Sequence, residues 1–442
     1  MKKFSKNFTW GTSTSSYQIE GAWNLDGKGE SIWDRFTHAP GHIERSENGD
    51  IACDHYHRYR EDIELMSRLG IPAYRFSISW PRILPQGKGA INQRGLDFYN
   101  KLVDALLEKG IEPWITLYHW DLPQALEDQG GWPNRVLTDY FQNYAGIMVK
   151  QLGDRVKHWM TLNEPWVISF LGYRDGVVAP GRKNRKSAFQ CAYHLLLAHG
   201  KAYSAMKALN SKLTIGITNV HHNYISFTRD EQSLRAAAFE DMVNNKIFLD
   251  PVLKGTYPQL LVQLRKDAPI IDPEDFKIMR QTDFMGIQYY HDVFLINGKK
   301  ELPATIQEKF PIYEYTEMGW PITPVGIFQQ LMLLYREYGV KNIVITENGS
   351  AWPDVLDPEG NVRDEKRQKY LLDHLGQVHR AMEHGAPVTG YFVWSFMDNF
   401  EWTQGYRPRF GLVYTDYATQ NRYIKDSARL FSTIIKENGI KG

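Results

Sequence analysis

The chain contains eight short runs of apolar residues, which are separated by longer amphipathic stretches. Most of these runs are continuously apolar rather than alternating, as is typical of strands that are buried on both faces. They predict strands over residues 8–17, 73–80, 112–120, 158–163, 214–219, 284–290, 342–346 and 388–396.

Helical periodicity occupies much of the sequence between these runs. The pattern predicts helices over residues 54–69, 95–109, 188–209, 324–338 and 364–384, and the first two are followed directly by Gly70 and Gly110, which end helices well. Strands that alternate with helices favour a single (β/α)8 barrel domain spanning residues 1–442. The alternative is a doubly wound open sheet, but no G-x-G-x-x-G pattern follows the first strand.

Two long stretches between predicted strands, residues 21–53 and 291–323, carry no clear periodicity. We expect them to form loops over one mouth of the barrel, where long loops are often functional. No linker, low-complexity tract or short repeat divides the chain.

Charge and cysteine content narrow the class of protein. Lys and Arg number 52 and Asp and Glu 51, which gives a net charge of +1 and argues against a nucleic-acid partner. No apolar run is long enough for a membrane span, and the lysines at the start precede no apolar signal segment. Cys53 and Cys191 are expected to be free thiols, so we expect a cytoplasmic protein.

Aromatic residues make up 13% of the chain, including 13 tryptophans. This content allows two interpretations: a large aromatic core, or a carbohydrate site in which rings stack on the apolar faces of sugars. Composition alone favours the aromatic core.

In a (β/α)8 barrel the carboxyl-terminal strand ends form the active-site face. Polar and aromatic residues gather at or just beyond the predicted strand ends. They are Gln18, Arg75, His119, Trp120, Asn163, Glu164, Gln288, Tyr290, Glu347, Trp394, Glu401 and Trp402.

Two glutamates follow β-rich runs in similar contexts, Glu164 after W-M-T-L-N and Glu347 after N-I-V-I-T. A carboxylate is costly to bury without partners, so we expect both to face the mouth of the barrel rather than its core. Each could be a solvated loop residue, but two carboxylates that flank a sugar bond can hydrolyse it if one stays ionised and the other holds a proton.

A metal site is the alternative that His119, His221, His222 and His291 suggest. Their spacing fits no compact ligand set, so we expect no metal, and nothing in the sequence calls for an organic cofactor.

The motifs T-L-N-E-P (161–165), I-T-E-N-G (345–349) and W-S-F-M-D-N-F-E-W (394–402) resemble those of glycoside hydrolase family 1, the β-glucosidase family. The resemblance runs from F-T-W-G-T-S-T-S-S-Y-Q-I-E-G to R-F-G-L-V-Y-T-D-Y, nearly end to end. It implies a retaining β-glycosidase, above all a β-glucosidase that removes terminal non-reducing β-D-glucosyl residues from a small β-glycoside or short oligosaccharide. Galactosyl or fucosyl groups and transfer to other acceptors remain open, as does the oligomeric state.

The resemblance also implies roles for individual residues. Glu164 would be the acid/base and Glu347 the nucleophile, which Arg75 and Tyr290 would keep ionised. Trp394 would be the stacking platform, and Trp320 would line the aglycone side. The remaining substrate-binding residues would be Gln18, His119, Trp120, Asn163, Glu401 and Trp402. One departure is Gln288, where the family usually has Asn.

Two alternatives share this scaffold. A non-catalytic sugar-binding protein could lose one carboxylate, yet both are present. A 6-phospho-β-glycosidase typically has Ser, Lys and Tyr, which bind the phosphate, where this chain has Glu401, Pro408 and Phe410. Glu401 would bring a negative charge to the place of a 6-phosphate and repel it. We therefore expect unphosphorylated substrates, although Arg407 and Arg409 lie close by in the sequence.

Overall fold

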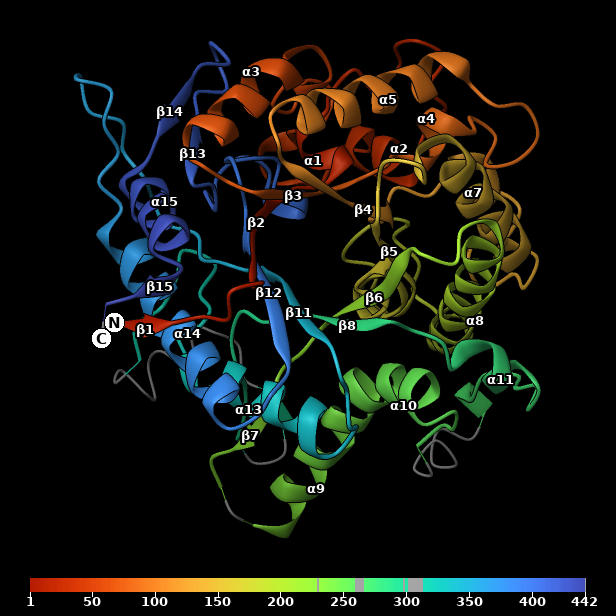
Figure 1. Ribbon diagram of the computed structural model, residues 1–442. Coiled ribbons are helices and arrows are strands. Elements are labelled where there is room, and N and C mark those ends of the chain that lie inside the picture. The colour runs from red at the N-terminus through yellow and green to blue at the C-terminus, as the bar shows by residue number, and fades with distance from the viewer. Residues whose placement is uncertain (229, 259–265, 297–298, 301–312, 442) are drawn as a thin grey trace.

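A computed structural model describes residues 1–228, 230–258, 266–296, 299–300 and 313–441. Eight parallel strands close into a barrel in the order β11-β12-β2-β3-β4-β5-β6-β8, with β12 paired to β2 (Figure 1). The barrel strands are β2 Thr9–Ser13, β3 Ala73–Ser77, β4 Glu112–Tyr118, β5 His158–Asn163, β6 Thr214–Val220, β8 Phe284–Gln288, β11 Ile343–Asn348 and β12 Val388–Trp394. The closed ring confirms the predicted (β/α)8 barrel and excludes the open sheet.

Five predicted strands are too long at their carboxyl ends, and the first two are the most overextended. The chain leaves β2 at Ser13 and enters the short helix α1 (Ser16–Ile19), where the Ser16 amide donates to the Ser77 hydroxyl at 2.7 Å. Trp80 begins helix α4 (Trp80–Ile83) instead of ending β3, because Pro81 in the first helical turn favours a helix start. Apolar character alone did not reveal either turn.

Helices surround the strands (Figure 1). The longer ones are α3 His55–Arg68, α5 Gln93–Glu108, α7 Leu137–Leu152, α8 Arg185–Leu209, α9 Glu231–Asp241, α10 Ile247–Leu253, α13 Pro324–Arg336, α14 Glu365–Glu383 and α15 Asp426–Glu437, with the shorter α6 Gln124–Glu127 and α11 Asp275–Met279. The five predicted helices are confirmed with shifts of no more than about three residues at their ends. Helix α7 was not predicted, although Leu137, Phe141, Tyr144 and Met148 place its buried face at helical spacing.

The stretch 21–53 is not the irregular loop that we expected, because it contains helix α2 (Ile32–His38). A capping box starts this helix: the Ser31 hydroxyl accepts from the Asp34 amide, and the Asp34 carboxylate accepts from the Ser31 amide. A 3-10 turn, Glu44–Ser46, follows.

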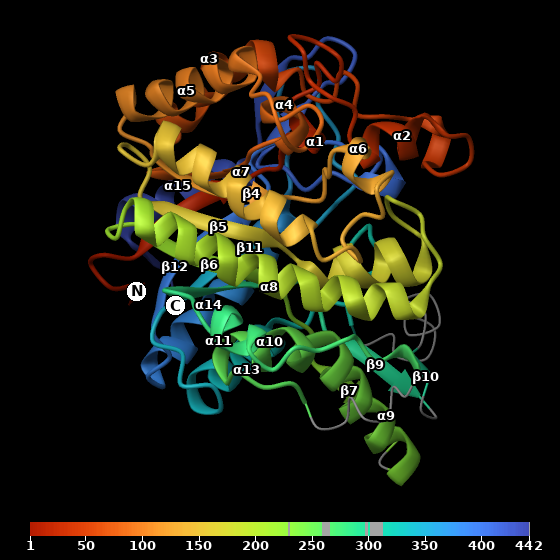
Figure 2. The same cartoon turned by 90° about the vertical axis from the view of Figure 1, so that its right-hand side faces the viewer.

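The stretch 291–323 contains β9 (Val293–Ile296) and β10 (Lys299–Lys300), which form a small sheet with β7 (Tyr224–Ser226). Residues 297–298 and 301–312 of this predicted loop lie outside the described residues. Figure 2 shows the small sheet on the side of the molecule opposite the two chain ends, where β1 (Lys2–Lys3) pairs with β15 (Gly439–Ile440).

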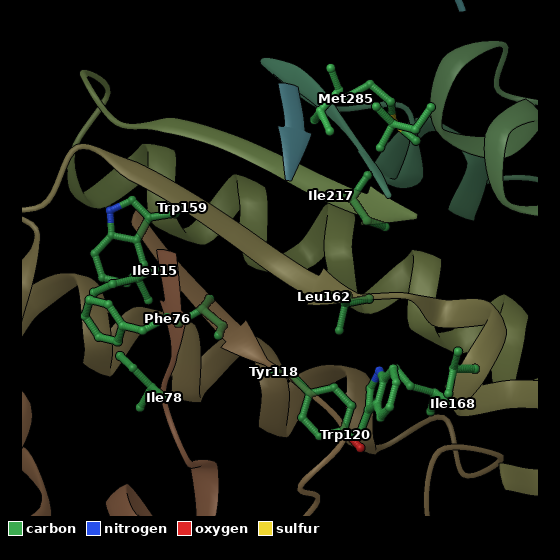
Figure 3. Close-up of a cluster of buried hydrophobic side chains, with 14 of the residues drawn as sticks. Phe76, Ile78, Ile115, Tyr118, Trp120, Trp159, Leu162, Ile168, Ile217 and Met285 are labelled. Carbon is green, nitrogen blue, oxygen red and sulfur yellow. The ribbon is translucent and has the colours of Figure 1, made fainter. Parts of the chain in front are cut away.

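Apolar side chains form two layers because successive residues of a strand point to opposite faces. Inside the barrel, six strands contribute one residue each to a separate cluster: Ala73, Trp114, Met160, Phe284, Val344 and Phe392. Gly11 and Gly216 leave room for two of these rings, since a Cβ atom at either position would come within 2.6 Å of Phe392 or Phe284. The intervening strand residues join the helices in the main core, part of which Figure 3 shows.

Both cysteines are buried and free, as predicted. In the described part of the chain, no helix is long and apolar enough to span a membrane.

Candidate active site

A cavity of about 410 Å³ opens at the carboxyl-terminal ends of the barrel strands. Nine of the twelve residues assigned to a site from the sequence line it: His119, Trp120, Glu164, Tyr290, Trp320, Glu347, Trp394, Glu401 and Trp402. The other three, Gln18, Arg75 and Asn163, are fully buried behind the lining and hydrogen bond to lining residues.

Glu347 lies at the end of β11 and is held by two donors. Arg75 Nη1 of β3 lies 2.5 Å from its Oε1, and the Tyr290 hydroxyl donates to its Oε2 at 2.7 Å. Burial raises the pKa of Glu347 above the ordinary glutamate value, while the Arg75 charge and both hydrogen bonds oppose the rise. These partners therefore favour the ionised form of a carboxyl that burial alone would neutralise.

Glu164, directly after β5, has a different environment. Among the described residues, no side chain or backbone group hydrogen bonds to its carboxyl group, although the cavity wall buries it. Burial, followed by the charge of Glu347, raises the pKa of Glu164 well above its ordinary value. The two carboxyls therefore differ in the way that an acid and an ionised partner require.

Asn163 connects Arg75 to the ring of His119. Its Oδ1 accepts from Arg75 Nη2 and, at 2.8 Å, from Gln288 Nε2, so its amide nitrogen must be the group that lies 3.1 Å from His119 Nε2. Burial holds the pKa of His119 well below the ordinary histidine value, so the ring is neutral. Its proton consequently lies on Nδ1, a buried donor without a partner among the described residues.

Glu401 forms the opposite wall, beyond β12. Gln18 Nε2 donates to its Oε2 at 3.4 Å and, more closely, to Phe400 O at 2.9 Å. Burial and the nearby Glu347 charge raise the pKa of Glu401 to about 8. Both causes favour the protonated form of this carboxyl near neutral pH.

Aromatic rings cover much of the wall. The Trp120 and Trp402 rings lie 4.4 Å apart, and the His119 ring stacks near both Trp394 and Trp402 at 5.9 Å. Farther along the cavity, Trp320 lies 5.3 Å from Tyr290. Rings at both ends suit a ligand that has apolar faces and polar edges.

The backbone is strained where it presents several of these side chains. Trp120, Glu164 and Trp402 all have positive φ angles, of 78°, 46° and 51°. Such conformations cost about 1–3 kcal/mol each and cluster at functional sites. Trp402 begins a 3-10 turn (Trp402–Gln404), which aims its indole beside Glu401.

Sequence reasoning missed several lining residues. Trp166 is the N-cap of a π-helical segment, Val167–Asp175, which begins three residues after Glu164, and Leu171 lies within that segment. His222, His291 and Met318 complete this outer part of the cavity. The proximity of Trp166 to Glu164 in the sequence was a usable signal. His222 and His291 were noted only as possible metal ligands, and Leu171 and Met318 carried no signal that stood out.

The four histidines that suggested a metal site do not all lie in the cavity. His119, His222 and His291 all line the cavity, and His221 is absent from the lining. In the part of the chain that the structure describes, no group of three or more His, Cys, Asp or Glu residues is arranged to hold a metal ion.

Neither arginine of the R-P-R-F stretch lines the cavity, although Arg407 also donates to Gln404 in its wall. Arg409 Nη1 lies 2.7 Å from Asp398 Oδ2, and Arg407 pairs with Glu44 and Glu317. Phe410 lines the cavity as expected, whereas Pro408 does not. Among the described lining residues there is no lysine or arginine.

The chain was compared with protein-family models, curated proteins and solved structures. The model of glycosyl hydrolase family 1 matches residues 1–440. The chain is 45% identical to "Beta-glucosidase A" of Thermotoga maritima over 100% of this chain and 99% of that protein. It is 48% identical to "Beta-glucosidase A" of Acetivibrio thermocellus over 99% of each.

A solved structure gives the same result. The β-glucosidase from Thermotoga maritima in complex with deoxynojirimycin superposes with a TM-score of 0.95 at 43% identity, over 100% of both chains. Family match, full-length identity and fold agree that this chain belongs to glycosyl hydrolase family 1 and is a glycoside hydrolase.

Proposed function

We propose that this glycoside hydrolase is a retaining β-glucosidase that uses Glu347 as its nucleophile and Glu164 as its acid/base. The observation that carries the assignment is the contrast between two carboxyls in one cavity. Glu347 is held by Arg75 and Tyr290, which favour its charge, and Glu164 has no such donor among the described residues. Groups whose environments separate their pKa values take opposite roles in acid and base chemistry.

In the first step, Glu347 attacks the anomeric carbon while Glu164 gives its proton to the departing glycosidic oxygen. The bond to the aglycone breaks, and a covalent glycosyl-enzyme forms through the Glu347 oxygen. Forming this ester removes the negative charge of Glu347. Because that charge helps burial to raise the pKa of Glu164, the pKa of Glu164 falls when the ester forms.

In the second step, the lower pKa that follows suits Glu164 to act as a base. It takes a proton from a water molecule, which attacks the same carbon and releases the sugar with its β configuration retained. Neither step requires a metal or an organic cofactor.

The sugar itself is proposed to stack on Trp394 and to bond to the polar wall. His119 offers its Nδ1 proton, Trp402 its indole N–H, and Glu401 two carboxyl oxygens. Gln18 and Asn163 stand directly behind Glu401 and His119 and complete this hydrogen-bonding set. The apolar and aromatic outer part of the cavity, including Trp320 and Trp166, would receive the aglycone.

Glucose is the proposed sugar because both curated relatives described above are named β-glucosidases and cover the whole chain. A cytoplasmic location is also proposed, and the two free cysteines are consistent with a reducing compartment.

The direct test is hydrolysis of nitrophenyl β-glucoside, β-galactoside and β-fucoside by the purified protein, with proton NMR of the first sugar released. We expect the glucoside to give the highest kcat/KM and β-glucose to appear before α-glucose. Release of α-glucose first would show inversion and rule out the proposed covalent step.

A further inference from the structure

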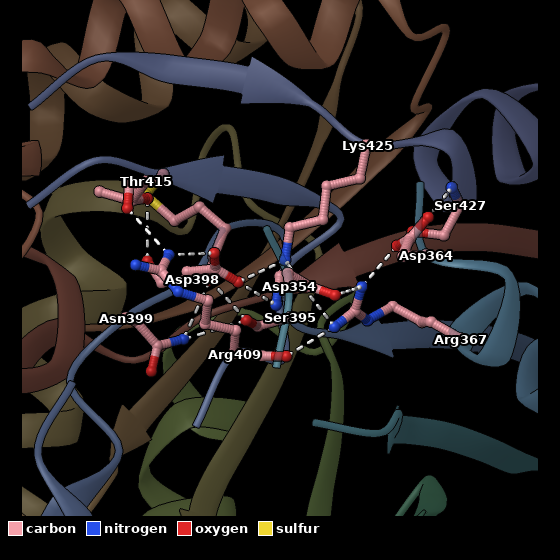
Figure 4. Close-up of polar contacts among 12 residues, drawn as sticks. Asp354, Asp364, Arg367, Ser395, Asp398, Asn399, Arg409, Thr415, Lys425 and Ser427 are labelled. Carbon is pink, nitrogen blue, oxygen red and sulfur yellow. Dashed lines mark hydrogen bonds and ion pairs between the residues drawn. The ribbon is translucent and has the colours of Figure 1, made fainter. Parts of the chain in front are cut away.

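A buried cluster of charges joins the segments that follow β11 and β12, and the reaction described above does not use it (Figure 4). The cluster contains three carboxylates and three cations, so its formal charges balance. Its members are Asp354, Asp364, Asp398, Arg367, Arg409 and Lys425.

Lys425 is the member that connects the two segments. Its side chain is fully buried, and its ammonium group contacts Asp354 and lies 2.7 Å from Asp398 Oδ1. Asp354 belongs to the segment that continues from Glu347, and Asp398 to the segment between Trp394 and Glu401. Lys425 therefore joins the segment that follows Glu347, the proposed nucleophile, to the segment that carries the sugar-binding wall.

Asp398 is connected to the wall of the cavity through its neighbour Asn399 and through Gln18. Its Oδ1 also accepts from the Gly411 amide at 2.9 Å, so the carboxylate is fixed from several directions. The next residue, Asn399, accepts from Gln18 Nε2 at 3.0 Å, and the same nitrogen reaches Glu401. A shift of Asp398 would thus reach Glu401 through two adjacent contacts.

We propose that Lys425 is a positioning residue for sugar recognition. It holds the segment 395–401, and with it Glu401, at a defined place relative to the strand that carries Glu347. Without the ammonium group, Asp354 would keep its partner Arg367 and Asp398 its partner Arg409. The cluster would nevertheless carry one buried negative charge in excess, and buried carboxylates in that position move apart or take up a proton. The inference rests on the proposed glucosidase function, because it concerns how the sugar is bound.

A comparison of two substrates separates positioning from simple loss of folded protein. Glucosides and xylosides differ only by the hydroxymethyl group. We expect the Glu401 wall to bind this group, because Glu401 stands at one of the positions that bind the 6-phosphate in phosphoglycosidases. The ratio of kcat/KM for nitrophenyl β-glucoside to that for nitrophenyl β-xyloside is independent of the fraction of active protein, because both values scale with it equally.

The test variant is Lys425→Met, which keeps the length of the side chain and removes its charge. We expect the glucoside-to-xyloside ratio to fall by at least about fivefold, since small displacements of binding groups cost large factors in rate. Asp354→Asn keeps the shape of its side chain and weakens the same link, so it should lower the ratio less.

The matched control is Lys207→Met, which removes another lysine from an ion pair, with Asp283 at 2.7 Å, just before β8 at the opposite end of the barrel. Its ratio should stay within about twofold of wild type. A folded Lys425→Met protein with a ratio equally close to wild type would overturn the proposal. If that variant does not fold, an unchanged ratio in Asp354→Asn overturns it instead.

The activity of the wild-type protein shows whether the positioning role of Lys425 or the glucosidase function itself has been contradicted. If wild type hydrolyses neither glycoside, the glucosidase assignment itself is wrong. If wild type hydrolyses the glucoside and the Lys425 variant keeps the wild-type ratio, only the positioning role is lost.

Discussion

Tyr290 and Gln288 lie two residues apart, and both lower the pKa of Glu347, Tyr290 more than Gln288. The Tyr290 hydroxyl donates to Glu347, whereas Gln288 donates to Asn163 and leaves its own Oε1 without a partner among the described residues. The first bond is made to a charged group, and the second joins two neutral amides. Hydrogen bonds to charged groups contribute about 1.5–3 kcal/mol, and neutral ones about 0.5–1.5 kcal/mol.

We therefore expect Tyr290→Phe to lower kcat/KM by about 10- to 100-fold and Gln288→Asn by less than about tenfold. Tyr290→Phe should also move the acidic limb of the pH profile upward, because it removes a bond that lowers the pKa of Glu347. Steady-state kinetics from pH 4 to pH 8 measure both effects. A hundredfold loss in Gln288→Asn would contradict the view that this departure from the family pattern is tolerated.

Glu401 couples recognition to stability. Burial and Glu347 raise the pKa of Glu401 to about 8 in the folded protein. Between the unfolded and the folded pKa, the folded protein therefore holds a proton on Glu401 that the unfolded chain has already released. Stability from this group is present below the unfolded value of about 4.3 and is lost as the pH rises through about 8.

Glu401→Gln removes this loss, so the variant should gain stability over wild type as the pH increases from 5 to 9. Thermal unfolding at pH 5, 7 and 9 measures the gain. The prediction fails if the difference in Tm between variant and wild type is the same at all three pH values.

At the scale of elements, the segment after β12 contributes most to the choice of sugar. The sequence argument placed a negative Glu401 where a 6-phosphate would lie. Because the pKa of Glu401 is about 8, the stronger reason is the lack of a lysine or arginine in the described cavity lining. Arg409 is held by Asp398, and its guanidinium lies 4.0 Å from the centre of the Tyr414 ring.

A phosphate dianion in this cavity would be buried without a cation, which is strongly unfavourable. We expect kcat/KM for nitrophenyl β-glucoside to exceed that for its 6-phosphate by at least about a hundredfold. Direct comparison of the two substrates measures this. A preference for the phosphate ester would instead support the phosphoglycosidase alternative.

The ends of helices and strands were predictable from the sequence where one clear feature marked them, such as a β-rich run or a glycine. The β-rich runs placed the start of most strands, and Gly70 and Gly110 placed the ends of two helices. Helix α2 was missed although Ser31 and Asp34 have capping-box spacing, because the surrounding stretch lacks a long apolar stripe.

The sequence predicted which residues gather at the site but not how they are hydrogen bonded to one another. Strand ends identified which residues gather, because parallel strands bring those ends to one face. The sequence could not reveal that Asn163 of β5 links Arg75, Gln288 and His119. These partners come from β3, from β8 and from the residue after β4, which meet only in the closed barrel.

For the whole molecule, the two ends of the chain meet at the face opposite the cavity. Trp10 is buried there among Phe4, Phe8 and Phe431, and its indole donates to Asn438 Oδ1 at 2.9 Å. This contact ties β2 to the last helix.

Trp10→Ala should cost about 3–5 kcal/mol of unfolding free energy, as for other large aromatic residues truncated in a core. KM for nitrophenyl β-glucoside should be unchanged, because the cavity lies at the other end of the barrel. Chemical denaturation and kinetics measure the two quantities. Trp23→Ala, at a partly exposed position, is the control and should lose less stability; an equal loss in both variants would contradict the closing role of Trp10.

The central claim is that Glu347 forms the covalent bond and Glu164 supplies and removes the proton. Identifying the product that Glu164→Ala forms from dinitrophenyl β-glucoside in the presence of azide tests it most directly. Such a leaving group needs no proton, and azide can replace the water that Glu164 would activate. We predict that azide restores turnover and that the product is β-glucosyl azide, while Glu347→Ala forms no β-azide. An α-glucosyl azide from the Glu164 variant, or losses in both variants that azide does not relieve, would contradict the assignment.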